Sequence, residues 1–161
     1  MRITALSRLF IKRLLQMQSA VLDELKLRKV LRTKNNPVAD YTEWLVSKSL
    51  DLKLVSNSRS GYDANDRRGI RYQIKGRRIT PGNPSTQFSA IRNLRRREFD
   101  VLIAVIFNAD YSVRYSAAVP HSVIMKLAHY QRHTNSWIVH LRPSVLTMRG
   151  VKDLTGKLAG G

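Results

Sequence analysis

Cysteine is absent from the 161-residue chain, which excludes disulfide bonds and metal sites built on thiolates. The chain also lacks any run of 18 apolar residues, so no segment has the sequence pattern of a membrane-spanning helix. A P-loop, the glycine fingerprint of dinucleotide-binding folds and a Ser–His–Asp arrangement are missing as well. These absences remove the usual sequence signals of nucleotide-driven enzymes, dehydrogenases and serine hydrolases.

Acidic residues are scarce. Eleven Asp and Glu stand against 29 Lys and Arg, which gives a formal net charge of +18. A chain this basic binds polyanions, so we expect nucleic acid or an anionic membrane surface as its partner. The hydrophobic content of 43%, with two Trp and six Tyr, is enough for a packed core. At this length the simplest organisation is a single domain over residues 1–161.

The N-terminal part of the chain is basic and amphipathic. From residue 4 to residue 27 apolar side chains recur at helical spacing, and this row consists of Leu6, Phe10, Leu14, Met17, Val21 and Leu25. The helix either packs on the domain core or, because the spacing approaches a heptad, pairs with another subunit. Basic side chains interrupt the apolar positions, so a secretory signal is not predicted, whereas organellar targeting stays open. We otherwise expect a cytoplasmic, nucleoid-associated protein.

The rest of the chain alternates helical and strand patterns. A second amphipathic helix begins near Asp40, and a third is predicted over residues 87–100. Between them lie a short strand and a hairpin whose return strand covers residues 70–76. Val101–Phe107 is a run of seven apolar residues, typical of a central strand covered on both faces. The pattern predicts an α/β fold, a mixed sheet flanked by helices. Its core spans about residues 38–108, with additions over 111–147 and a frayed tail.

Four polar residues of this layout are predicted to meet. Gln73 and Lys75 share one face of the return strand, because alternate residues of a strand point the same way. Pairing across the hairpin brings Asp63 beside them, and Glu43 reaches the same place from the second helix. Oxygen donors of this kind suit Mg²⁺, with Asp63 as the anionic ligand and the Gln73 amide and Ile74 carbonyl completing the set. Lys75 then holds the attacking water and stabilises charge growing on phosphorus.

The basic residues gather around this candidate centre. Residues 67–97 hold ten basic side chains and no acidic one. A phosphate backbone is the natural counterpart of such a surface, so we expect these arginines to bind nucleic acid. Besides Lys75, the set consists of Arg67, Arg68, Arg71, Arg77, Arg78, Arg92, Arg95, Arg96 and Arg97.

The stretch GYDANDRRGIRYQIKGRR, preceded by the Glu43 helix and followed by FDVLIAVIF, resembles the PD-(D/E)xK nuclease superfamily. The likeness covers roughly residues 40–107 and implies the restriction-endonuclease-like fold, with core order helix, three strands, helix, strand. It implies that Asp63 binds the metal, that Lys75 is the motif lysine and that Glu43 matches the helical glutamate of many members. Gln73 stands where the family usually has Glu or Asp, so one metal-binding charge is missing.

The resemblance implies an endonuclease that hydrolyses double-stranded DNA with Mg²⁺, for which Mn²⁺ can substitute. A homodimer or higher homo-oligomer is compatible with it, because double-strand cutting usually needs two active sites. The rival interpretation is a non-catalytic nucleic-acid-binding protein, for example a ribosome-associated one, in which Gln73 marks an eroded centre. A membrane-surface role of the N-terminal helix is disfavoured, because basic residues continue along the whole chain. Asp66 is expected to shape the hairpin turn, and Tyr62 and Tyr72 are expected to pack.

Overall fold

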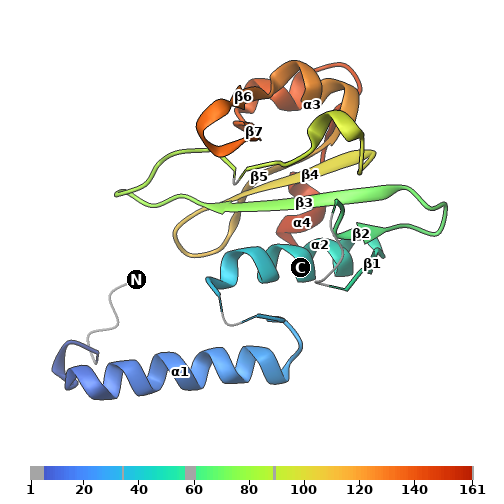
Figure 1. Ribbon diagram of the computed structural model, residues 1–161. Helices are drawn as coiled ribbons and strands as arrows, with labels where there is room; N and C mark the ends of the chain where they lie inside the picture. The colour runs from blue at the N-terminus through green and yellow to red at the C-terminus, as the bar shows by residue number, and fades with distance from the viewer. Residues whose placement is uncertain (1–5, 34, 57–60, 89, 161) are drawn as a thin grey trace.

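A computed structural model describes residues 6–33, 35–56, 61–88 and 90–160. Figure 1 shows a sheet with α2 and α4 on one side, α3, β6 and β7 on the other, and α1 as a separate outer layer. In chain order the elements are η1 (Leu6–Arg8), α1 (Ile11–Leu27), α2 (Pro37–Leu50), β1 (Lys53–Leu54), β2 (Ala64–Asn65), β3 (Arg71–Arg78), η2 (Leu94–Arg96), β4 (Val101–Phe107), β5 (Val113–Pro120), α3 (His121–Leu127), β6 (His129–Gln131), η3 (Arg132–Thr134), β7 (Ser136–Ile138), η4 (Pro143–Thr147), β8 (Lys152–Asp153) and α4 (Thr155–Ala159).

The main sheet has six strands in the order β1-β2-β3-β4-β5-β8. Only β3 and β4 run parallel, and the other neighbours are antiparallel, so the expected mixed α/β sheet is confirmed. Six of the seven β4 residues are buried, which confirms a central strand covered on both faces. The predicted hairpin is also confirmed, because β2 pairs with β3 through Ala64 opposite Tyr72.

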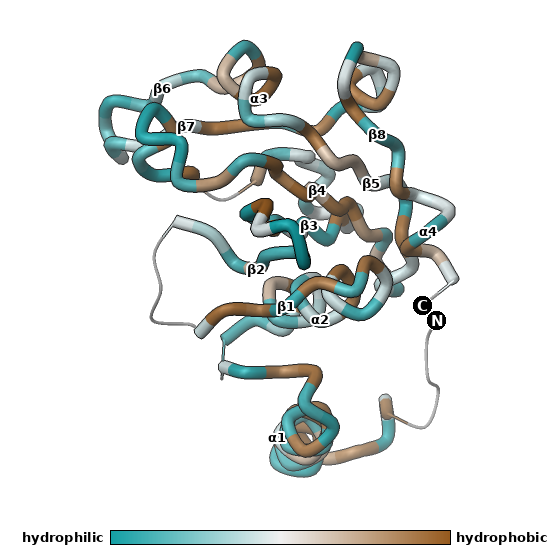
Figure 2. The backbone as a smooth tube through the Cα atoms, turned by 90° about the vertical axis from the view of Figure 1, so that its right-hand side faces the viewer, coloured by the Kyte–Doolittle hydropathy of each residue, from teal (hydrophilic) through white to brown (hydrophobic). Residues whose placement is uncertain are grey.

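Strand β4 divides the core into two halves. Ile103, Val105 and Phe107 pack with Ile74 and the α2 side chains on one face. Leu102 and its alternate neighbours pack on the other face, against Phe88, residues 91–99 and the C-terminal segments. Figure 2 shows the same layering by hydropathy, with apolar stretches of β4 and β5 between α2 below and β6, β7 and α3 above.

Helix α2 lies unusually close to β3 at Gly76. A Cβ built on Gly76 would stand 1.8 Å from Thr42 Oγ1, so only glycine allows this approach. Thr42 is fully buried, and its hydroxyl donates to the Val38 carbonyl at 2.5 Å. Asn36 caps the helix by accepting from the Val38 N–H, and Pro37 follows at the first helical position. This close packing brings Glu43, the residue after Thr42, towards the hairpin.

The prediction of a third helix over residues 87–100 is wrong. The segment is largely irregular, with the single turn η2, so the described chain lacks the second helix of the order expected for the core. Asn93 and Arg97 have φ values of +53° and +49°, which a continuous helix cannot contain. Phe88, Ile91 and Leu94 recur every three residues, and in the structure all three are buried side chains of the core. Backbone bridges to the C-terminal segments replace helical hydrogen bonds.

The two chain ends also differ from expectation. Helix α1 buries none of its residues, so the prediction that it packs on the domain core is wrong. The alternative, in which α1 pairs with a helix of another subunit, stays a prediction. The expected start of α1 at residue 4 lies outside the described residues. The described part of the tail, up to residue 160, does not fray, because Leu158 of α4 is only 1% exposed and packs against the α2 side of the core. No helix within the described ranges is long and apolar enough to cross a membrane.

Candidate active site

Asp63 lies where the pairing of β2 with β3 ends. Its backbone N–H donates to the Tyr72 carbonyl at 2.8 Å, which continues the hairpin by one residue. Its carboxylate turns towards β3, where Oδ2 accepts from the Ile74 N–H at 2.6 Å and from Gln73 Nε2 at 2.5 Å. Among the described residues no donor reaches Oδ1. The predicted meeting of Asp63 with Gln73 is confirmed.

The Ile74 carbonyl faces the same edge of β3 as its N–H, because both groups of one strand residue point to the same side. Strand β2 pairs only with Arg71 and Tyr72, so no further residue of β2 covers this part of the edge. The carbonyl oxygen therefore lies on the Asp63 side of the strand, as the predicted ligand set requires.

Gln73 and Lys75 project from the opposite face of β3 to Ile74. In the parallel register Gln73 is paired with Leu102 and Lys75 with Ala104, and both partners belong to the half of the core away from α2. The positive charge of Lys75 acts on Asp63 and opposes the rise of its pKa. Gln73 donates its amide nitrogen to Asp63, so its amide oxygen would reach an ion beside Asp63 only after the amide turns over.

Glu43 approaches from α2 and is paired with a residue that the sequence did not single out. Arg32 forms an ion pair with Glu43 and donates from Nη1 to the Val55 carbonyl at 2.9 Å. The Arg32 backbone N–H is held by Asp40 Oδ2 at 2.9 Å. Asp40 is itself buried and accepts from Thr33 as well, so it fixes the loop that carries Arg32.

Two mostly buried carboxylates therefore share this place. Burial raises the pKa of Asp63, and the Ile74 N–H, Lys75 and Gln73 offset part of the rise. Burial also raises the pKa of Glu43, the negative charge of Asp63 adds to this rise, and Arg32 opposes it. Carboxylates whose negative charge is disfavoured by burial gain from a nearby cation.

A cavity of about 220 Å³ opens between these side chains. Glu43, Asp63 and Arg32 line it, together with Tyr62 and Val55. Within the described ranges no group of three or more acidic, histidine or cysteine side chains gathers to hold a metal ion. Few oxygens are available to a cation here. They are the carboxylate of Asp63, the Ile74 carbonyl and the carboxylate of Glu43, which is already paired with Arg32. Such a set fits a single hard cation that keeps several waters.

Part of the predicted nucleic-acid surface is already engaged within the fold. Arg71 donates from its backbone N–H and its guanidinium to Asp100, at distances of 3.0 and 3.1 Å. Arg67 pairs with Asp51 at 2.8 Å, with both side chains highly exposed. The Asp100 pair fixes the start of β4 beside β3, so Arg71 is chiefly structural. An exposed pair such as the Arg67 pair opens at little cost when a phosphate competes.

Arg77 and Arg78 border a larger hollow of about 790 Å³ between α1, the N-terminus of α2 and the end of β3. Arg77 donates to Asn83 Oδ1 at 2.7 Å, and the Arg78 guanidinium lies 4.7 Å from the centre of the Tyr111 ring. Both cations are thus held at the rim of this groove, which shares Asn35 and Ala39 with the lining of the Asp63 cavity.

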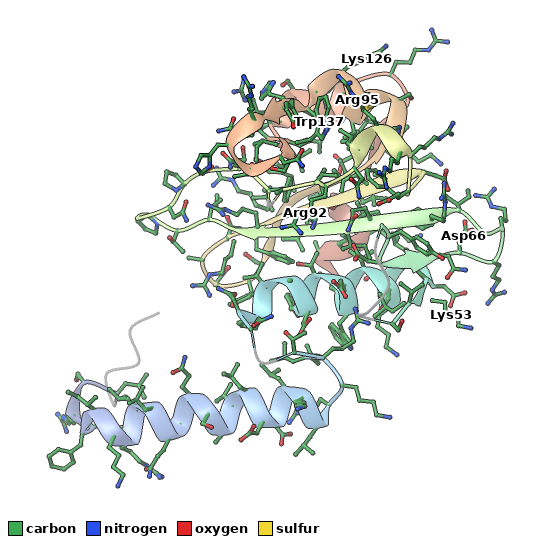
Figure 3. All side chains as sticks on the ribbon, in the orientation of Figure 1. Lys53, Asp66, Arg92, Arg95, Lys126 and Trp137 are labelled. Carbon is green, nitrogen blue, oxygen red and sulfur yellow. The ribbon has the colours of Figure 1, made fainter. Side chains whose placement is uncertain are left out.

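Three further arginines lie on the other side of the sheet. Arg92, Arg95 and Arg96 are exposed in and around η2. Figure 3 shows Arg95 beside Trp137, well above the hairpin that carries Asp66. Asp66 itself accepts from the Arg68 and Ile70 N–H groups and closes the turn, which confirms its expected structural role.

Arg32 is a residue of this site that sequence analysis missed. Arg32 carries no local pattern that separates it from the other 28 basic residues, and only the folded loop brings it to Glu43. A scan against models of known protein families and a search of the curated proteins both found no match to this chain. The assignment of function therefore rests on the geometry of Asp63, Ile74, Lys75 and Glu43.

Proposed function

We propose that this chain is a Mg²⁺-dependent endodeoxyribonuclease with a restriction-endonuclease-like core. The observation that carries the proposal is the position of Asp63. Its carboxylate is held on the open edge of β3 by the Ile74 N–H, where it lines the Glu43 cavity and feels the positive charge of Lys75. The parallel pairing of β3 with β4 and the central position of β4 agree with that core.

In this proposal each residue of the site has its own role in DNA hydrolysis. Asp63 and the Ile74 carbonyl would supply oxygen ligands to the cation, and Glu43 lies close enough to Asp63 to interact with its charge. A divalent cation, when bound, would neutralise charge on the scissile phosphate. Lys75 would orient the water that attacks phosphorus and stabilise the negative charge that develops on the phosphoryl oxygens. Arg77 and Arg78 would hold the DNA backbone in the neighbouring groove.

Substitution of two residues tests the assignment. Asp63→Ala and Lys75→Ala are expected to abolish Mg²⁺-dependent cleavage of plasmid DNA while leaving DNA binding in chelator largely intact. Asp23→Ala and Lys126→Ala change the same residue types at exposed positions on α1 and α3 and serve as matched controls. Cleavage by the Asp63 and Lys75 variants at the wild-type rate would refute the site.

A non-catalytic nucleic-acid-binding protein is the second candidate. It is favoured by the pairing of Glu43 with Arg32 and of Asp63 with Gln73, because the two carboxylates already have partners without a metal. In that case DNA or RNA binding would depend on the arginines and not on divalent ions. Nicking of supercoiled DNA with Mg²⁺ or Mn²⁺, compared with chelator, separates the two candidates.

Self-association through α1 belongs to the same proposal. Phe10, Met17 and Val21 form a stripe along one side of the helix and are 87%, 39% and 59% exposed. Such a stripe is costly in water and is typical of a helix that meets another helix. A second copy of the chain would bring a second centre, which cutting both strands of DNA requires.

Charges beside the stripe select the orientation of the pair. Arg13 and Glu24 are eleven residues apart, about three turns, and therefore lie on the same flank. An antiparallel pair sets Arg13 of each copy opposite Glu24 of the other. Glu24 already pairs with Arg28 of its own chain at 2.7 Å, but this exposed pair opens at little cost. The midpoint of Arg13 and Glu24, residue 18.5, nearly coincides with residue 19, the midpoint of Met17 and Val21. This register therefore brings the Met17–Val21 part of the stripe together in the two copies, and Phe10 lies outside it. A parallel pair would not bring these two charges together.

A further inference from the structure

Besides the Asp63 cavity and the Arg77 groove, a further hollow of about 430 Å³ lies on the face of the sheet away from α2. None of its lining residues lines the Asp63 cavity or the Arg77 groove. It is lined by Asn93, Arg95, Arg96, Tyr130, Asn135 and Trp137.

Two distant segments are locked together to build this hollow. The Ile91 N–H donates to the Trp137 carbonyl and the Trp137 N–H to the Ile91 carbonyl, both at 2.9 Å. Leu94 is 1% exposed, and the buried His121 ring nitrogen Nε2 lies 2.8 Å from its carbonyl oxygen. Arg95 and Arg96 therefore project from a turn whose backbone is held in place before any ligand arrives.

One of the two aromatic side chains of the hollow, Tyr130, is unusually accessible, whereas Trp137 is half-buried and packs against the core. Tyr130 is 50% exposed, the only large hydrophobic side chain with such exposure outside the α1 region among the described residues. Its ring centre lies 5.3 Å from that of Trp137, with the rings inclined at 57°, and its hydroxyl donates to Asn135 Oδ1 at 2.8 Å. The Arg95 guanidinium lies 5.3 Å from the Trp137 ring centre (Figure 3).

We propose that this hollow binds an unpaired nucleotide of a DNA strand. Aromatic rings beside arginines are the combination with which proteins hold single strands, because every base can stack and every phosphate can pair. The base would lie against Tyr130 and Trp137, and its phosphates against Arg95 and Arg96. A base inside a duplex has both faces covered by its neighbours, so only an unpaired nucleotide can use the rings.

The inference rests on the proposed nuclease function and narrows its substrate class. Lys75 shares its face of the sheet with Ala104, and the η2 segment packs over that same half of the core through Leu94. A strand bound in the hollow therefore lies on the face from which Lys75 projects. The preferred substrate would be a duplex with an unpaired branch or overhang, which should bind more tightly than an uninterrupted duplex such as a plasmid.

Binding measured in chelator tests the proposal separately from cleavage. Fluorescence anisotropy would compare a blunt duplex with the same duplex carrying a short unpaired overhang. Loss of one stacked base corresponds to about 5- to 150-fold in affinity. Tyr130→Ala is thus expected to weaken binding of the overhang duplex at least fivefold and to leave blunt-duplex binding unchanged, whereas Tyr130→Phe should bind like wild type.

A second readout follows Trp137 directly. A short single-stranded oligonucleotide should quench tryptophan fluorescence, and the quenching should disappear in Trp137→Phe, which keeps an aromatic ring in the core. Equal losses on both duplexes, or no loss with Tyr130→Ala, would overturn the inference. If Asp63→Ala still cleaves while the Tyr130 effect is present, only the catalytic proposal fails. If Asp63→Ala is inactive and Tyr130→Ala changes nothing, only the nucleotide site fails.

Discussion

Replacement of Gln73 by Glu tests whether the centre is built to hold a cation. In the structure the Gln73 amide nitrogen donates to Asp63 Oδ2. Gln73→Glu removes this donor and sets a second carboxylate against the first. The change has almost the same shape as the native side chain, so its effects report charge and hydrogen bonding and not packing.

The expected destabilisation is large for a single substitution. Loss of a hydrogen bond to a charged acceptor costs about 1.5–3 kcal/mol. Two carboxylates about 4 Å apart repel by at most about 4 kcal/mol at an effective dielectric constant of 20, and uptake of one shared proton reduces this. Without divalent ions at pH 8, Gln73→Glu should therefore lower the free energy of unfolding by about 3 kcal/mol. At pH 5.5 the loss should be smaller, because a shared proton restores a hydrogen bond to Asp63.

Mg²⁺ should reverse the loss. A ligand at about 100 times its dissociation constant stabilises the folded state by about 2.7 kcal/mol. Urea unfolding of Gln73→Glu in chelator and in 10–20 mM Mg²⁺ measures this, with plasmid cleavage recorded in parallel and expected to be maintained or increased. Gln16→Glu makes the same change at an exposed position of α1 and should show neither effect. If Gln73→Glu is as stable as wild type in chelator, or gains no stability from Mg²⁺, the Asp63 centre is not a cation site.

Three further predictions concern packing, assembly and pH. Gly76→Ala drives a methyl group into Thr42 and should cost at least about 1–3 kcal/mol in urea unfolding and abolish cleavage, with Thr42→Ala in the same chain recovering part of the stability. Met17→Glu should turn a dimer into a monomer in analytical ultracentrifugation, and a chain that is monomeric before the change would contradict the α1 pairing. Because burial raises the pKa of Asp63, ionised Asp63 costs stability as pH rises through that pKa. Asp63→Asn should therefore melt higher than wild type at pH 7.5, and the difference should vanish near pH 3; a constant difference across this range would show that burial of the charge is not the cause.

Local periodicity was enough to predict the hairpin and the central strand. Alternation places Ile74 towards the core and Gln73 and Lys75 on the other face, and the apolar run of β4 requires cover on both sides. The turn at Asp66 follows from its short side chain, which hydrogen-bonds its own backbone. Each of these features depends on residues only a few positions apart, so it can be predicted from the local sequence.

The same reasoning failed where local preference and long-range pairing compete. Phe88, Ile91 and Leu94 recur every three residues, as on a helix, yet Ile91 exchanges hydrogen bonds with Trp137, 46 residues further along. The amphipathic row of α1 was recognised, but whether it meets the core or a partner depends on where the loop after it leads. Arg32 reaches Glu43 only because Asp40 holds that loop.

Three features follow from the sequence without any tertiary contact: the strong positive charge, the apolar and polar faces of β3, and the buried strand β4 beside it. Composition and alternation act within a few residues, and no distant contact can change them. Only the tertiary contacts show that Asp63 accepts from Gln73 and that Arg32 pairs with Glu43. They also place exposed Tyr130 and half-buried Trp137 beside two arginines. These arrangements depend on which backbone groups find partners across the chain, and a hydrogen bond between distant residues leaves no periodic trace in the sequence.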